Sequence, residues 1–159
     1  MNQDLPHLSA PHCTVATVVE RQQRYLLVLE ERNGQLVYNQ PAGHLELGES
    51  LVDAAVRETL EETAWHVQIR AYLGVSLYRA PANGITYVRH SFSGRAMGFE
   101  PDRVLDSGIV DAVWLDFMEI EALRDRLASP LVYQDILRYR QDKLYPIEMA
   151  DTYIAPELE

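Results

Sequence analysis

The stretch Gly43–Trp65 reads GHLELGESLVDAAVRETLEETAW and contains one helix whose start is marked in the sequence. Ser50 is an N-cap residue, and Asp53 follows it at the spacing of a capping box. Apolar side chains then recur at helical spacing, at Val52, Ala55, Val56 and Leu60. The pattern predicts a helix over 51–63, preceded by an irregular loop over 41–49.

Three glutamates, Glu58, Glu61 and Glu62, project from one stripe of this helix, roughly opposite its valines and leucine. Three like charges raise one another's pKa values, and a merely solvated face would normally carry lysines among them. A hard divalent cation removes the repulsion, because Mg²⁺ takes oxygen ligands and keeps positions open for phosphate oxygens. The stripe therefore predicts a metal site rather than an acidic surface.

The overall charge limits the class of partner. The 159 residues include 14 basic and 24 acidic side chains, a formal net charge of −10. Such a surface repels nucleic acid and anionic lipid, and it repels phosphate compounds too unless divalent cations are held at the site. We therefore expect neither nucleic acid nor a membrane as partner. With a cation held by the glutamate stripe, the expected partner is a small phosphorylated metabolite.

The other bulk properties favour a cytoplasmic protein. Cys13 is the only cysteine, which excludes an internal disulfide. No apolar run approaches the roughly 18 residues needed to cross a bilayer, and the N-terminus has no features of a signal peptide. Oligomeric state stays open between a monomer and a homodimer.

The remaining chain is read as one domain. Residues 1–11 are expected to be a flexible lead-in, and residues 12–159 a single domain that includes C-terminal helices. The predicted strands cover 13–19, 25–30, 36–39, 68–79, 86–97 and 110–115, and the predicted later helices cover 118–127 and 130–143. This order indicates an α/β (α+β) sandwich.

The opening stretch resembles the Nudix box, the motif of the Nudix hydrolase family. The residues at the family's spacing are Gly43, Glu49, Arg57, Glu58, Glu61 and Glu62. Thr59 and Trp65 replace aliphatic residues, and Ala64 replaces the closing glycine, at a cost of roughly 1 kcal/mol if the helix ends in left-handed geometry. The resemblance implies a Nudix α/β/α sandwich with a mixed β-sheet and the box helix packed against it.

The resemblance also implies roles for the box residues. Glu58 and Glu62 match the principal metal ligands, and Glu61 matches a third carboxylate that binds metal or orients the attacking water. These three are the expected catalytic residues, and the backbone carbonyl of Gly43 or Ala42 is an expected further ligand. The implied cofactor is Mg²⁺, with Mn²⁺ as an alternative, in metal-assisted hydrolysis of a phosphoanhydride.

Two features around the metal site stay open. Glu49 and Arg57 match the family's structural ion pair, although Arg57 could instead touch a substrate phosphate. In some family members the general base lies on a later loop, where Asp106 and Asp111 are the candidates here. Gly108 stands where an acidic residue often precedes the tryptophan, so the sequence does not choose between them.

Segments outside the box resemble a branch of bacterial phosphatases within the family. They are PHCTVATVV (11–19), YNQPAGHLE (38–46), SPLV (129–132) and YPIEM (145–149). The resemblance implies release of orthophosphate from nucleoside di- and triphosphates and thiamine-type diphosphates. The alternative is a pyrophosphohydrolase of linked nucleoside diphosphates, such as ADP-ribose or dinucleoside polyphosphates. A non-catalytic metabolite sensor is disfavoured because all three box carboxylates are present.

Substrate contacts are expected from aromatic and basic side chains on the later elements. Arg89 is the preferred phosphate contact, because a guanidinium matches phosphate geometry bidentately. The other candidates are Tyr78, Tyr87, Tyr133 and Arg138. His90 is interpreted as a packed or solvated residue, Cys13 as a small core residue, and His44 as a neighbour of backbone metal ligation.

Overall fold

The computed structural model describes residues 10–154, so most of the predicted lead-in, 1–11, lies outside the described residues. Strand β1 (His12–Arg21) is central to a mixed sheet. It pairs in parallel with β6 (Thr86–Phe99) and antiparallel with the short β4 (Ala42–His44). Strand β6 also pairs antiparallel with β5 (Trp65–Arg79).

The second part of the sheet is built on β2 (Arg24–Arg32). It pairs antiparallel with β3 (Gln35–Asn39) and with β7 (Ile109–Asp116), and it joins β1 through a tight hairpin. The β2–β3 turn at Asn33 and Gly34 has positive φ at both residues, as the two-residue turns of hairpins require. Asn-Gly is the dipeptide that most favours such a turn.

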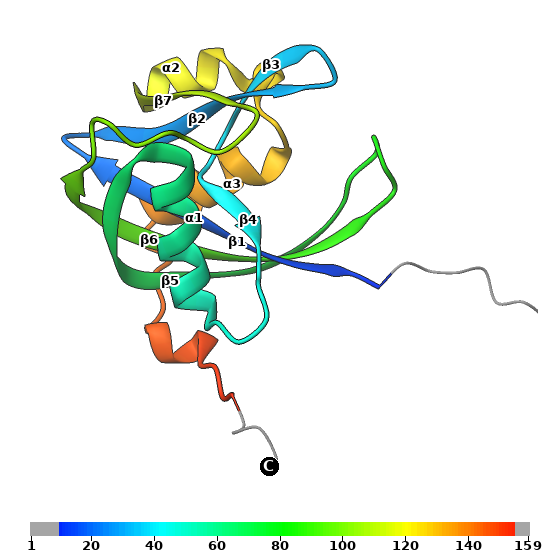
Figure 1. Cartoon of the computed structure of the whole chain (residues 1–159), viewed down its shortest axis with the longest axis vertical. Coiled ribbons are helices and arrows are strands. Elements are labelled where there is room, and N and C mark those ends of the chain that lie inside the picture. Colours follow the sequence, from blue (N-terminus) through cyan, green and yellow to red (C-terminus); the bar gives the residue numbers. More distant parts are fainter. Residues whose placement is uncertain (1–9, 155–159) are drawn as a thin grey trace, which may run out of the picture.

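Helices cover the two faces of the sheet (Figure 1). Helix α1 (Leu51–Thr63) packs on one face, where Ala54 and Ala55 share a core with side chains of β1, β2, β5 and β6. Helices α2 (Phe117–Ala122) and α3 (Pro130–Arg140) pack with other side chains of β1, β2 and β5 in a second core. The predicted α/β/α sandwich with a mixed sheet is confirmed.

Short 3₁₀ helices complete the described chain. They cover Arg124–Arg126 and Ile147–Ala150, and Ala150 belongs to the core beneath α1. The chain before the second of them closes the edge of β5, because Tyr72 and Tyr145 exchange two backbone hydrogen bonds. Among residues 10–154, no helix is long and apolar enough to span a membrane.

Helix α1 begins and ends as predicted, and its predicted face packs on the core, but the most buried face is shifted around the helix towards its small residues and glutamates. Ser50 Oγ accepts the Asp53 backbone N–H at 3.0 Å. The buried residues are Ala54, Ala55, Glu58, Thr59, Glu62 and Thr63, whereas the predicted apolar residues Val52, Val56 and Leu60 are only half-buried. The small side chains let the helix approach β1 closely, so that Thr17 Oγ1 donates to the carbonyl of Ala55.

Two other predictions of local structure were wrong. The predicted irregular loop 41–49 contains β4, because the free edge of β1 is available to residues 42–44 as a partner. The predicted helix 118–127 stops at Ala122 and continues as a 3₁₀ turn. Leu127 and Ala128 bridge to Tyr38 of β3, which draws the chain away from the helix axis.

Ala64 ends α1 in left-handed geometry, with φ 60° and ψ 13°, and it is 3% exposed. Glycine there would relieve about 1 kcal/mol of backbone strain but would lose a buried methyl worth about 0.8 kcal/mol. We therefore expect Ala64→Gly to change the free energy of unfolding by less than about 0.5 kcal/mol in urea titration. A gain well above about 1 kcal/mol would mean that the methyl contributes little packing.

Candidate metal centre

Carboxylates from two distant segments meet at the C-terminal half of α1. Oxygen atoms of Glu58, Glu61 and Asp106 all lie within 4.8 Å of one another. Asp106 is held there by its backbone, whose N–H donates to the carbonyl of Glu61 at 3.1 Å. This spacing suits a hard cation with oxygen ligands.

The loop before α1 packs directly against these carboxylates. A Cβ at position 43 would overlap the carboxylate of Glu58, so any larger residue there would displace that carboxylate. The Ala42 backbone N–H donates to Glu62 Oε2 at 2.9 Å, and the Pro41 carbonyl accepts from the Thr17 N–H at 3.0 Å. The backbone of the loop is thus fixed between β1 and the box helix, with Gly43 against a carboxylate.

Burial makes the charged forms of Glu58 and Glu62 unfavourable in the absence of a cation. Burial raises the pKa of Glu62 to about 8, although the hydrogen bond from Ala42 opposes it. Burial also raises the pKa of Glu58, against the effect of Arg57. Since a bound divalent cation favours the charged form of each group, the donor set fits a metal.

Arg57 and Glu49 form the ion pair that the sequence predicted. Arg57 Nη2 lies 2.7 Å from Glu49 Oε1, and Arg57 Nε donates to Glu49 Oε2 at 3.0 Å. The guanidinium lowers the pKa of Glu49, as expected for a bidentate pair. Arg57 Nη1 also contacts Glu58 at 2.8 Å and Glu61 at 3.0 Å, which the sequence did not predict. Arg57 therefore links the loop to the carboxylate cluster.

The structure separates the two candidates for a later acidic residue. Asp106 belongs to the cluster, whereas Asp111 is exposed on β7 in register with Leu29. The backbone N–H of Ile109 bonds to the Asp106 carbonyl, and Gly108 has φ +90°. The glycine in place of an acidic residue is thus part of the tight turn that follows Asp106.

Arg89, predicted as a phosphate contact, lies instead in a buried polar network. The side chain is only 7% exposed, donates through Nη2 to Gln40 Oε1, and places Nε 3.6 Å from Asp135 Oδ2. Burial lowers its pKa, and Asp135 opposes that effect. Because its guanidinium is enclosed and Nη2 donates to Gln40, we do not carry Arg89 forward as a substrate contact.

Asp135 of α3 is fully buried, and the sequence analysis missed it. It accepts from Ser91 Oγ at 2.6 Å and from Arg138 Nη1 at 3.1 Å, and Arg138 also donates to Ser76. Its position between the apolar residues Val132 and Ile136 was the available signal for a buried charge. Arg138, predicted as a substrate contact, is therefore held between α3 and β5.

The predicted tyrosines lie on the side of the sheet that faces α3. Tyr78 and Tyr133 line one cavity of about 510 Å³, together with Arg124, Gln134 and the chain at 127–130. The Tyr133 ring packs against Phe117, and the Arg124 guanidinium lies 4.2 Å from the Tyr133 ring centroid. Mainly the edge of the Tyr133 ring is therefore accessible to a ligand. Tyr87 lies next to Tyr78 in register and contacts the rings of two histidines.

His90 and Cys13 lie on the α1 side of the sheet, as strand alternation from Val15 requires. His90 Nδ1 is 2.9 Å from the Tyr72 hydroxyl, and the two rings stack. This packed role agrees with the interpretation of His90 from sequence. His44 lies beside the metal loop, and its carbonyl accepts from Arg57 Nη2 at 3.0 Å.

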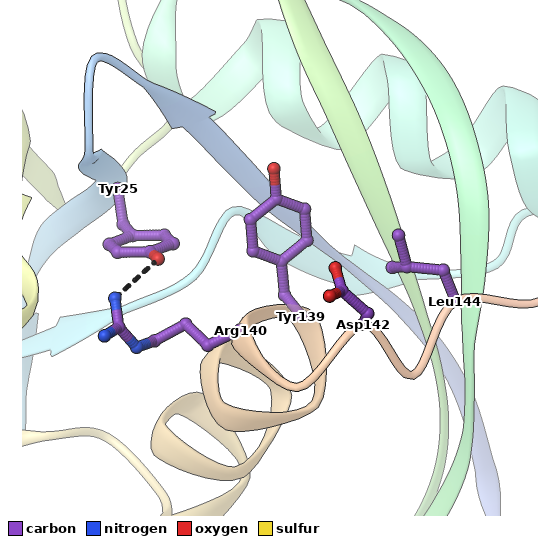
Figure 2. Close-up of a pocket in the computed structure, with 5 residues that line it drawn as sticks. All are labelled: Tyr25, Tyr139, Arg140, Asp142 and Leu144. Carbon is purple, nitrogen blue, oxygen red and sulfur yellow. Dashed lines mark hydrogen bonds between the residues drawn. The ribbon is translucent and has the colours of Figure 1, made fainter.

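A second cavity, of about 330 Å³, lies at the opposite end of β2 from the β2–β3 turn (Figure 2). Tyr25, Tyr139, Arg140, Asp142 and Leu144 line it. Arg140 reaches across to the Tyr25 hydroxyl at 3.4 Å. No box residue lines this cavity, so it is separate from the carboxylate cluster.

The family follows from comparison with known proteins. Residues 10–136 match the model of the NUDIX domain, which is most of the chain. The chain belongs to the Nudix hydrolase family. It is an enzyme of that family, and the expected resemblance to the Nudix box is confirmed.

Individual relatives agree with this assignment. "Phosphatase NudJ" of Escherichia coli K12 is 37% identical over 146 residues, which cover 92% of this chain and 94% of that protein. A solved Nudix hydrolase from Nitrosomonas europaea is 44% identical, with a TM-score of 0.87 over 90% of this chain and 97% of the other. The Nudix domain of Shewanella oneidensis NrtR, solved with ADP-ribose, shares the fold at 21% identity, with a TM-score of 0.70 over 89% of this chain and 94% of the other.

Proposed function

We propose that this Nudix hydrolase uses Mg²⁺, or Mn²⁺ in its place, to release orthophosphate from the terminal phosphate of a small organic di- or triphosphate. The observation that carries the proposal is the cluster of Glu58, Glu61 and Asp106 beside Gly43. Similarity to a protein named as a phosphatase over 92% of the chain supports the choice of orthophosphate as product.

Each residue of the cluster has a defined task in the proposed mechanism. Glu58, the carbonyl of Gly43 and Glu62, which lies outside this cluster, would hold the metal, and Glu61 would be a further ligand or the group that orients the attacking water. The cation supplies charge neutralisation at the phosphate and a lower pKa for the water. Asp106 is exposed beside Glu58 and Glu61, so it can accept the proton of that water. Arg57 and Glu49 position the loop.

The organic part of the substrate would occupy the 510 Å³ cavity. Its volume is in the range of small-molecule sites, and Tyr78 and Arg124 supply an aromatic face and a positive charge. Tyr87 lies between this cavity and the metal loop, as its register with Tyr78 and its proximity to His44 indicate. Nucleoside di- and triphosphates and thiamine-type diphosphates are the proposed substrate class.

Product analysis tests the reaction class. Purified protein with Mg²⁺ would be incubated with thiamine diphosphate, nucleoside di- and triphosphates, ADP-ribose and diadenosine polyphosphates, and products resolved by chromatography. We expect orthophosphate from the first two groups. Nucleoside monophosphate from only the linked compounds would replace the proposal with the pyrophosphohydrolase alternative.

Asp106→Asn tests the role of the later carboxylate. We expect kcat to fall about 10²-fold, because an amide cannot accept the water's proton, while the fold is unchanged at this exposed position. Asp111→Asn is the matched control and should retain wild-type kcat, because Asp111 lies on the edge of β7 outside the cluster. Equal activity in both variants would remove Asp106 from the mechanism.

A further inference from the structure

Three aromatic side chains in contact, and a fourth on the neighbouring strand, lead from the metal loop towards the 510 Å³ cavity. His44 lies on β4, His12 on β1, Tyr87 on β6 and Tyr78 on β5, and we call these four residues the aromatic row. Ring centroids are 5.1 Å apart for His44 and His12, and 5.7 Å apart for His12 and Tyr87. Tyr78 is the register partner of Tyr87 and lines the cavity.

The aromatic row lies on the α3 side of the sheet. Side chains two residues apart on a strand share a face, so Tyr87 faces the same way as Arg89, whose Nε is 3.6 Å from Asp135 of α3. His12 and Tyr87 are half-buried and His44 is exposed, so solvent reaches the row. The row therefore continues the wall of the cavity towards the metal loop.

Hydrogen bonds hold these rings in place. His12 Nδ1 lies 3.0 Å from His44 Nε2, and Asn83 Nδ2 donates to the Tyr87 hydroxyl at 3.1 Å. A wall whose rings are already fixed loses little side-chain freedom when a ligand binds. Such a wall favours a flat partner, because offset or edge-to-face contacts need a planar ring.

The position and length of the aromatic row suit a phosphorylated heterocycle. His44 follows Gly43, which packs against Glu58, so the backbone at the start of the row lies beside the carboxylate cluster, while the His44 ring points to the opposite face of the sheet. The four residues lie on adjacent strands in the order β4, β1, β6 and β5, so the row spans roughly 14 Å at about 4.8 Å per strand spacing. A phosphorylated heterocycle with its terminal phosphate at the metal would extend along it.

We propose that the aromatic row binds the planar heterocycle of the substrate and that His12 is a specificity-determining residue. This inference rests on the proposed function and names the residues that bind the aromatic ring of its substrates. A cationic ring would gain further from the electron-rich ring faces. His12 acts on the organic group and has no part in holding the metal or in the chemistry at phosphorus.

The test compares His12→Ala with wild type on ligands that do and do not carry a ring. Thiamine diphosphate would be the substrate, and methylenediphosphonate, which has no ring, would be the competitive inhibitor. We expect the KM for thiamine diphosphate to rise about tenfold with kcat unchanged, because a tenfold loss of affinity corresponds to the loss of one stacking contact. The inhibition constant of methylenediphosphonate should stay within about twofold of wild type.

Three further variants make the comparison specific. His66→Ala removes an exposed histidine that pairs with Gly98, far along β6 from Tyr87, and should behave as wild type. Tyr87→Phe keeps the ring but loses the hydrogen bond from Asn83, so its KM should rise by less than that of Tyr87→Leu, which should rise as that of His12→Ala does. Circular dichroism and Tm would show that each variant is folded.

An unchanged KM in His12→Ala would overturn the inference. Equal weakening of thiamine diphosphate and methylenediphosphonate would also overturn it, since His12 would then act through the metal loop. If wild type cleaves only the linked dinucleotides, the proposed function fails. The same comparison on that substrate then still decides whether His12 binds its heterocycle.

Discussion

Glu62→Gln is expected to lower kcat about 10³-fold in saturating Mg²⁺ while raising the stability of the metal-free protein. Loss of an anionic ligand weakens binding of the cation, and the cation's stabilisation of the transition state is worth several kcal/mol. The amide oxygen can still accept the Ala42 N–H, so the loop retains its hydrogen bond. The measurements are steady-state kinetics and urea unfolding without metal.

The gain in stability follows from the sign of the pKa shift. Burial raises the pKa of Glu62 to about 8 from an ordinary value of 4.5. A raised folded-state pKa stabilises the protein fully below the unfolded value, and that contribution is lost as pH rises through the folded value. Metal-free wild type should therefore lose stability between pH 4.5 and 8, whereas Glu62→Gln has no group to ionise there, keeps its stability over this range and is the more stable protein at pH 8.

Two controls accompany the Glu62 variant. Glu148→Gln changes an exposed glutamate outside the cluster and should alter neither activity nor stability. Addition of Mg²⁺ at pH 8 should restore the stability of wild type but not affect Glu62→Gln to the same extent. Full activity of Glu62→Gln would exclude Glu62 from the metal ligands.

Arg89→Met is expected to destabilise the protein by about 3–5 kcal/mol, the usual cost of removing one partner from a buried ion pair. The substitution leaves Asp135 fully buried with only Ser91 and Arg138 as partners, and it leaves the Gln40 side chain without its donor. Urea unfolding would measure the loss as a lower midpoint.

Arg138→Met is the matched comparison, because Arg138 contacts the same aspartate but its side chain is 31% exposed. We expect it to cost about 1 kcal/mol, since water can replace its hydrogen bonds. A stable Arg89→Met protein that had lost substrate affinity would contradict the structural role and return Arg89 to the phosphate contacts that the sequence predicted.

The sequence alone determined the features that depend on local spacing. The helix from Leu51 to Thr63 and its Ser50 cap could be predicted from the residues themselves, whereas the pairing of Glu49 with Arg57 was implied by the resemblance to the Nudix box. Each depends on residues within about one turn of helix or a short loop, where the chain itself fixes the distances. The turn at Asn33 and Gly34 belongs to the same class.

Only the tertiary structure decided which distant side chains share a site. Asp106 and Asp111 look equivalent in sequence, but only the turn after Asp106 brings its carboxylate to Glu58. Arg89 and Asp135 are 46 residues apart, and neither strand nor helix periodicity shows that they meet in the interior. The short strand β4 likewise exists because β1 offers a free edge. Long-range packing sets these contacts, and periodicity along the chain carries no information about it.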